Sequence, residues 1–283
     1  MIKSFREAIR FFKNSLIYKY YDLRIQTPSN PYEVSFKKDA YKVLFILSHM
    51  RSGSSLLTHI VISNPAIKGY GETHIRYSSE ADFKHLMSKV YFHSQVFTNI
   101  QDLGKLKMNH TYILDKLLHD NKLLNENLLK LDNFYFIFLV REPKRTLMSM
   151  LDHKPHWTEK EAIDYYSQRL SSLTKYSQII NDKKRSLLIT HHQLINESES
   201  VFQILQNFLN TQVAFSENYQ ILNTTGKRHV GDFKENIRSG RIMRKPRELN
   251  MSISPHLLEE QIQNFDHCYE ILSQCCQTIS NHP

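Results

Sequence analysis

The segment that most constrains this fold is a strand, a short loop and a helix between residues 41 and 62, with the sequence YKVLFILSHMRSGSSLLTHIVI. Five consecutive apolar residues, Val43 to Leu47, are typical of a strand that is buried on both faces of a parallel sheet. The small residues Ser52 to Ser55 allow a tight turn, and the helix that follows directs its positive N-terminal end at that turn. The sequence therefore predicts a strand–loop–helix unit that binds an anion.

A second apolar strand is followed by a helix with a phosphate-binding pattern. The residues from Phe134 to Val140 are all apolar, and Arg141 comes directly after them. Pro143 suits the first position of a helix, where its missing N–H costs no hydrogen bond, so a helix should run through residues 144–151. Ser149 lies on this helix. The planar guanidinium group of arginine and the hydroxyl of serine are both suited to binding a phosphate.

The rest of the chain alternates strands with helices and contains no internal repeat. This alternation predicts an α/β fold, with a mostly parallel central sheet flanked by helices and ligands at the carboxyl ends of the strands. A long helix should begin at Thr158, because Thr158 and Glu161 have the spacing of a capping box. Further helices are expected over residues 83–99, 117–131, 201–209 and 255–279, and further strands over residues 112–114 and 186–190.

Length, charge and cysteine content narrow the class of protein. The 283 residues are enough for one domain with a full core, which we expect to span residues 41–283. The formal net charge of +9 indicates anionic partners, such as a nucleotide, nucleic acid or a membrane surface. No apolar run is long enough to cross a membrane, and the three cysteines do not resemble a disulfide framework, so a cytoplasmic location is expected. No CxxC or HExxH pattern occurs, and no metal is expected.

The first forty residues, 1–40, are expected to form a basic amphipathic helix and a linker that precede the domain. Lysine and arginine residues alternate there with apolar residues that recur at helical spacing, namely Phe5, Ile9, Phe12, Leu16 and Tyr20. We expect this helix to pack on the domain. The alternative is contact of residues 1–20 with a membrane surface.

The loop RSGSS after one strand, with Arg141 and Ser149 after a second, resembles the phosphate-binding motifs of sulfotransferases that use 3′-phosphoadenosine 5′-phosphosulfate (PAPS). The motifs are closest to those of protein-tyrosine and carbohydrate sulfotransferases. The loop lacks the lysine of the ATP-type pattern GxxxxGK(S/T). The resemblance implies the single-domain sulfotransferase fold and PAPS as sulfate donor, with Arg141 and Ser149 at its 3′-phosphate. It also implies a 5′-phosphosulfate site made by Arg51, Ser52, Gly53, Ser54 and Ser55.

Two segments resemble those that carry the catalytic residues of this family. Gly71-Glu72-Thr73 is similar to a Gly-Glu-Glu-Thr segment of the protein-tyrosine sulfotransferases, which implies that Glu72 is the general base. Lys116, in an expected strand, resembles a lysine that contacts the sulfate, although the proline of that motif is absent here. Together with Arg51 these two residues form the expected catalytic set. Alternatively, Glu72 lies in a surface turn and Lys116 pairs with a neighbouring aspartate.

The resemblance extends to two further parts of the nucleotide site. The segment LLITHHQLI takes the place of the family's Tyr-Glu-(Asp/Gln)-Leu segment, which implies that His191 packs on adenine. Two adjacent histidines on a strand would point to opposite faces and would not share a metal. A basic arm follows, with eight lysine or arginine residues between Lys227 and Arg247. The family closes a basic loop over the nucleotide in this region, a role that falls here on Arg238, Ser239, Gly240 and Arg241; a solvated run of charge is the alternative.

The acceptor pocket of the family is built by residues after the base and after the helix that binds the 3′-phosphate. Here we expect His74, Arg76, Trp157 and Tyr165 to line it, with ordinary helix packing as the alternative for Tyr165. Because no membrane anchor of the kind found in enzymes that sulfate proteins is evident, we expect a hydroxyl or N–H of a small molecule or glycan as the acceptor. A guanidinium alkaloid of the saxitoxin type and a protein tyrosine are alternatives.

Two other classes of protein share part of these features. A nucleotide kinase would have a similar strand–loop–helix, but the loop would carry a lysine. A nucleic-acid binder would explain the positive charge, but not the pairing of Arg141 with Ser149. The expected partners are therefore the donor and a small acceptor, and not nucleic acid. The sequence leaves the oligomeric state open.

Overall fold

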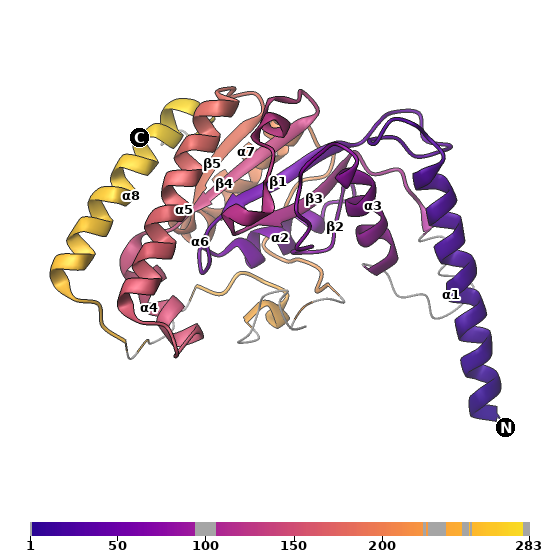
Figure 1. Cartoon of the computed structure of the whole chain (residues 1–283), viewed down its shortest axis with the longest axis horizontal. Coiled ribbons are helices and arrows are strands. Elements are labelled where there is room, and N and C mark those ends of the chain that lie inside the picture. Colours follow the sequence, from indigo (N-terminus) through magenta and orange to yellow (C-terminus); the bar gives the residue numbers. More distant parts are fainter. Residues whose placement is uncertain are drawn as a thin grey trace.

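The computed structural model describes residues 2–93, 106–222, 225, 236–244, 249 and 251–279, with residues 2–13 and 236 described by their backbone alone. Five parallel strands form one sheet in the order β2-β3-β1-β4-β5, and helices flank it (Figure 1). This arrangement confirms the predicted single α/β domain with a parallel central sheet. The strands are β1 (Lys42–Ser48), β2 (Ile67–Gly69), β3 (Tyr112–Leu117), β4 (Phe134–Val140) and β5 (Ser186–Thr190).

The apolar run in β1 supplies both layers of the core. Val43, Phe45 and Leu47 belong to one buried cluster, and Leu44 and Ile46 belong to the other. This division follows from the alternation of side chains along a strand. Five helices contribute to the first cluster: α1 (Ile2–Gln26), α3 (Asp82–His93), α4 (Pro143–His153), α5 (Glu159–Ile180) and α8 (Pro255–Cys275). Three helices contribute to the second cluster: α2 (Ser54–Ile62), α6 (His191–Asn196) and α7 (Ser198–Leu209).

The helix predicted over residues 117–131 is wrong. Strand β3 continues to Leu117, and the chain then forms two short 3₁₀ turns, η2 (Asp120–Lys122) and η3 (Glu126–Lys130). The backbone here bonds to a distant residue: Tyr77 N–H donates to the Lys122 carbonyl at 2.7 Å, and Leu124 N–H donates to the Tyr77 carbonyl at 2.8 Å. These long-range bonds replace the local bonds of a helix, and spacing within the segment does not reveal them.

The predicted capping box is confirmed at the start of α5, where the Thr158 hydroxyl accepts from the Glu161 N–H and the Glu161 carboxylate accepts from the Thr158 N–H. A second capping box, between Thr190 and Gln193, starts α6. The placement of His191 on a strand is therefore wrong, because β5 ends at Thr190 and His191 opens a helix. Helix α8 likewise ends at Cys275, four residues before the expected end.

The N-terminal helix α1 packs on the domain through a different face from the one that the sequence pattern indicated. Among residues 14–26, whose side chains are described, the buried apolar residues are Ile17, Tyr21 and Ile25, which join the core cluster beside α3. Leu16 and Tyr20, members of the predicted apolar stripe, are 53% and 38% exposed. Figure 1 shows α1 at the margin of the molecule, with its N-terminal half extending away from the sheet. Among the described residues, no helix is both long and apolar enough to cross a membrane.

Candidate active site

The carboxyl ends of the parallel strands bring the candidate residues to one edge of the sheet. Arg51 follows β1, Glu72 follows β2, Arg141 follows β4 and His191 follows β5. Lys116 lies near the carboxyl end of β3. Because the strands are parallel, residues far apart in the sequence meet at this edge, which is where α/β sheets bind ligands.

The loop between β1 and α2 has a backbone that a glycine makes possible. Gly53 precedes the first residue of α2 and has a φ of +95°, and Arg51 has a φ of +64°. A Cβ at position 53 would lie 2.8 Å from Cδ2 of His191. The loop therefore needs glycine both for its left-handed conformation and for the close approach of the histidine ring. The first N–H groups of α2 have no acceptor within the helix, as at any helix start, and they suit an anion in this loop.

The two phosphate motifs found in the sequence contact each other. Arg51 Nε donates to Ser149 Oγ at 2.8 Å, and Arg141 Nη1 donates to the Arg51 carbonyl at 3.1 Å. Burial lowers the pKa of Arg141 to about 10, although the neighbouring Glu142 opposes this shift. Arg141 thus keeps its charge at neutral pH although it is partly withdrawn from water. A half-buried pair of arginines beside a serine hydroxyl is a chemically suitable site for a phosphate.

Two histidines lie near these arginines: His49 is buried and bonds to the backbone of Arg141, and His191 is half-buried beside Gly53. His49 is fully buried, with Nδ1 2.9 Å from the Met50 carbonyl and Nε2 accepting from the Arg141 N–H at 3.0 Å. The N–H of Arg141 requires an unprotonated Nε2, so the ring is neutral and its Nδ1–H donates to Met50. Burial lowers the pKa of His49 to about 4 and that of His191 to about 3. Both rings are therefore neutral at physiological pH and add no charge to the cationic site.

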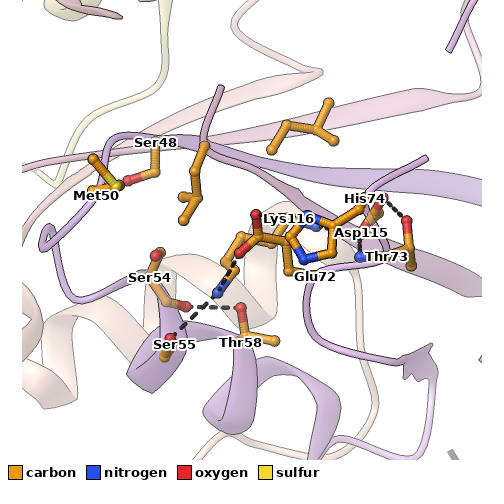
Figure 2. A network of polar contacts seen from close by, with 12 residues as sticks. Ser48, Met50, Ser54, Ser55, Thr58, Glu72, Thr73, His74, Asp115 and Lys116 are labelled. Atoms are coloured by element: carbon orange, nitrogen blue, oxygen red, sulfur yellow. Dashed lines mark hydrogen bonds and ion pairs between the residues drawn. The ribbon is translucent and has the colours of Figure 1, made fainter. Parts of the chain in front are cut away.

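Figure 2 shows Lys116 and Glu72 pointing toward each other beside the start of α2. Lys116 Nζ is 3.6 Å from Glu72 Oε2 and donates to Ser55 Oγ at 3.3 Å. The side chains of Lys116 and Glu72 are only 2% and 8% exposed. Burial lowers the pKa of Lys116, while the carboxylate of Glu72 opposes the shift. The structure therefore brings the candidate base, the candidate lysine and the anion-binding loop together.

The segment that carries Glu72 is held by Asp115, which lies on the opposite face of β3 from Lys116. Its carboxylate accepts from the Thr73 N–H at 3.0 Å, the Tyr77 hydroxyl at 2.7 Å and the Lys116 N–H at 2.8 Å. Burial raises the pKa of Asp115, and these hydrogen bonds oppose the shift. His74 follows with a φ of +60°, and its Nδ1 lies 3.4 Å from Glu72 Oε1. Glu72 is thus flanked by a lysine and a histidine.

A group of aromatic residues adjoins the start of the loop after β1. The Tyr165 hydroxyl donates to the Leu118 carbonyl at 2.7 Å and accepts from the Met50 N–H at 3.0 Å. Its ring lies 5.6 Å from that of His119 and 5.9 Å from that of Trp157, centroid to centroid. Lys154 Nζ lies 3.9 Å from the centroid of Trp157.

One of these rings, that of His119, is affected by the charge of the candidate base Glu72. Burial lowers the pKa of His119, and the negative charge of Glu72 opposes this shift. His119, a residue that the sequence pattern did not single out, therefore contacts the Tyr165 ring and lies near enough to Glu72 to be affected by its charge. Arg76 is exposed, and it forms no hydrogen bond or ion pair with any of the described residues. The structure therefore shows no contact of Arg76 with Trp157 or Tyr165.

The described part of the basic arm is anchored beside α2. Gly240 has a φ of +67°, and its carbonyl accepts from the Tyr219 N–H at 2.9 Å. Arg241 forms an antiparallel bridge with Asn218, and the Tyr219 ring lies 5.8 Å from that of His59 on α2. Arg238 and Ser239 are exposed on this segment. Of the remaining basic residues of the arm, only Arg244 is described; Lys227, Arg228, Lys234, Lys245 and Arg247 lie outside the described residues.

One buried arginine at this edge was not found from the sequence. Arg169 of α5 donates from Nε to the Ser48 carbonyl at 2.8 Å and from Nη2 to the Leu117 carbonyl at 2.8 Å, and its Nη1 lies 2.6 Å from Asp120 Oδ1. It thereby joins the carboxyl ends of β1 and β3. Its position among the apolar residues of α5 was the available signal, because a charged residue on a buried helix face needs partners. Among the described residues, no group of three or more histidine, cysteine or acidic side chains could hold a metal ion.

The comparisons with known proteins agree with this architecture. No protein-family model matches the chain, and no curated protein does. Among solved structures, a sulfotransferase domain from the curacin biosynthetic pathway matches with a TM-score of 0.52 and 15% identity, over 81% of this chain and 99% of that one. A sulfotransferase domain from the Synechococcus PCC 7002 olefin synthase matches with a TM-score of 0.50 and 16% identity, over 81% and 97%.

A third match is a mouse sulfotransferase, SULT7A1, complexed with PAP, with 13% identity over 63% of this chain and 61% of that one. Its TM-score of 0.40 is too low for the match to bear on this chain. The first two matches cover nearly the whole of the matched domains, and they share with this chain an arrangement that its own motifs predicted. The fold of this chain is therefore that of the sulfotransferases.

Proposed function

We propose that this protein is a sulfotransferase that moves the sulfuryl group of PAPS to a hydroxyl, or an N–H, of a small molecule or glycan. The observation that carries the proposal is the meeting of three groups at one sheet edge. They are the anion-binding loop after β1, the Arg141 and Ser149 motif that contacts it, and the buried pair of Lys116 and Glu72. A phosphate site alone would suit many nucleotide-binding proteins, but the adjacent carboxylate adds a base.

The residues present suit the donor. Gly53 allows the left-handed turn of the loop and the close approach of the His191 ring, and Arg51 and Arg141 supply charge in a half-buried setting. We assign the 5′-phosphosulfate to Arg51 and the N–H groups of residues 52–55, and the 3′-phosphate to Arg141 and Ser149. His191, which lies over Gly53, would contact the adenosine part. Arg238 to Arg241 would complete the nucleotide site from the basic arm.

The chemistry follows from the charges around Glu72. Its carboxylate would accept the proton of the acceptor hydroxyl as the new O–S bond forms and the bond between sulfur and the 5′-phosphate oxygen breaks. Lys116 would stabilise the negative charge that develops on the transferring group and on the leaving phosphate oxygen. Its hydrogen bond to Ser55 holds the ammonium at the loop. Positioning and charge stabilisation would supply most of the rate, as in phosphoryl transfer.

The acceptor side favours a neutral or anionic molecule. Lys154 lies over Trp157, so a cation already occupies one face of this ring. A guanidinium alkaloid would meet this positive charge, and the structure gives no observation in favour of that alternative. The two sulfotransferase domains that share the fold come from a biosynthetic pathway and from an olefin synthase, which supports a natural-product hydroxyl as the acceptor.

The test is the variant Glu72→Gln, which keeps the shape of the side chain and removes the base. A metabolite extract incubated with PAPS and the protein identifies a sulfated product by mass spectrometry. With that acceptor we expect turnover to fall by about 10²–10⁴-fold in Glu72→Gln, with unchanged donor affinity. Glu260→Gln, an exposed position on α8, is the matched control and should retain full activity. Wild-type turnover in Glu72→Gln would remove Glu72 from the mechanism.

A further inference from the structure

Over residues 14–26, the part of α1 with described side chains, the helix has two apolar rows, and the domain covers one of them. The covered face consists of Ile17, Tyr21 and Ile25. Leu16, Tyr20 and Leu23 form a second apolar row and are 53%, 38% and 67% exposed. At 3.6 residues per turn, the two rows lie roughly 130° apart around the helix axis. The exposed row therefore needs an explanation other than packing on this domain.

A fully exposed phenylalanine extends this row. Phe36 is 97% exposed and has a φ of +62°, a conformation that a bulky side chain rarely adopts. The loop that carries it is tied to α1, because Arg24 Nη2 donates to the Ser35 carbonyl at 2.7 Å and the Ser35 N–H donates to the Arg24 carbonyl at 2.8 Å. The Arg24 guanidinium lies 5.4 Å from the Tyr20 ring centroid and 6.0 Å from that of Phe36. Phe36 is thus held next to the exposed row at a cost in backbone strain.

The charges around this row have both signs, with a small excess of positive ones, since Glu33 and Asp39 are exposed in the loop that carries Phe36. Lys19 is exposed one position before Tyr20, Arg24 lies between Tyr20 and Phe36, and Lys38 is exposed just after Phe36. Asp22 lies about 125° from the centre of the row around the helix axis. Over residues 1–26 the sequence has six lysine or arginine residues and two acidic ones. The same spacing of apolar residues continues in the sequence at Phe5, Ile9 and Phe12.

We propose that Leu16, Tyr20, Leu23 and Phe36, hereafter the α1 face, dock the protein on an anionic phospholipid surface. Leucine and aromatic side chains on one side of a helix, bordered by lysine and arginine, are the pattern of a helix that lies in the membrane interface. The basic residues would lie at the depth of the negative headgroups. Figure 1 shows α1 at the margin of the molecule, where its outer side is free of the other elements. This proposal does not depend on the enzymatic reaction.

The positive border decides between a membrane and a second copy of the chain. Two α1 faces packed on each other would bring Lys19, Arg24 and Lys38 of both copies together, and like charges repel. An anionic bilayer instead complements these residues and accepts the apolar side chains. The strained Phe36 is also at the end of the face, where a single ring can enter the headgroup region.

The experiment is co-sedimentation of the full chain with vesicles of phosphatidylcholine alone and with vesicles that also contain phosphatidylglycerol, at low and high salt. We expect binding to the anionic vesicles only, weakened by salt. Leu23→Glu and Phe36→Asn should each reduce the vesicle affinity by about tenfold, on the scale of one apolar side chain withdrawn from water. Ile262→Glu on α8 is the matched control, because Ile262 is 43% exposed away from the α1 face.

Phe36→Asn separates docking from folding, because asparagine tolerates a positive φ better than phenylalanine does. This variant should unfold at the same temperature as the wild type or at a higher one, while its affinity for anionic vesicles falls by about tenfold. The proposal is overturned if the wild type does not bind anionic vesicles, if it binds neutral vesicles equally well, or if Ile262→Glu weakens binding as much as Leu23→Glu. A dimer in sedimentation velocity that Leu23→Glu dissociates would also overturn it, in favour of a second copy.

Discussion

His49 should make the stability of this protein depend on pH. The ring is fully buried, its Nε2 accepts the Arg141 N–H, and burial lowers its pKa from 6.5 to about 4. When the pH lies between these two pKa values, His49 is protonated in the unfolded chain and neutral in the folded chain. Stability from this residue is therefore complete above the unfolded pKa and is lost as pH falls toward the folded one. At about pH 5 the loss amounts to about 2 kcal/mol.

The variant His49→Gln isolates this contribution. Its amide oxygen can accept the Arg141 N–H, but it does not titrate, so contributions from the other histidines are common to both proteins. Urea unfolding followed by the fluorescence of Trp157, the only tryptophan, gives the free energy of unfolding. Between about pH 7 and about pH 5 the wild type should lose about 2 kcal/mol more than His49→Gln. His267→Gln, an exposed position, should behave as the wild type. Equal losses in His49→Gln and the wild type would refute the reasoning.

Two further variants test the loop and the acceptor side. Gly53→Ala places a Cβ 2.8 Å from the His191 ring at a φ of +95°, so urea unfolding should show a loss of stability, and calorimetry should show weaker nucleotide binding. The left-handed conformation alone should cost about 1–2 kcal/mol, and unchanged stability would show that the loop relaxes freely. Trp157→Ala should raise the KM of the acceptor by about tenfold and leave the KM of the donor unchanged. An equal effect on both constants, or none, would place Trp157 outside the acceptor pocket.

The local sequence pattern was sufficient to predict the strands and helices that carry the candidate site. The apolar runs of β1 and β4 are long and uninterrupted because both faces of these strands are buried, so their type and position were evident. The capping box at Thr158 and the proline at the start of α4 fixed two helix starts through local hydrogen bonding. The sequence also placed the two phosphate motifs at the carboxyl ends of parallel strands, but the direct hydrogen bond between Arg51 and Ser149 was not predicted.

The errors arose where distant residues decide the local structure. Residues 117–131 have an apolar content typical of a helix, but their backbone bonds to Tyr77 and is also held by Arg169. Helix α1 offers two apolar rows, and periodicity cannot tell which of them the domain covers. Arg169 and His119 have no local motif. Their roles come from contacts with strand ends and with the charge of Glu72, which the sequence places far away.

The most direct test of the account is calorimetric titration of the wild type and Arg141→Ala with adenosine 3′,5′-bisphosphate, in parallel with ATP. The site that Arg51, Arg141 and Ser149 form should bind the bisphosphate in preference to ATP. Arg141→Ala should weaken this binding by about 2–3 kcal/mol, the scale of a hydrogen bond to a charged group. Lys144→Ala, exposed on the same helix, should leave it unchanged. No binding of the bisphosphate, tighter binding of ATP, or an unchanged dissociation constant in Arg141→Ala would contradict the account.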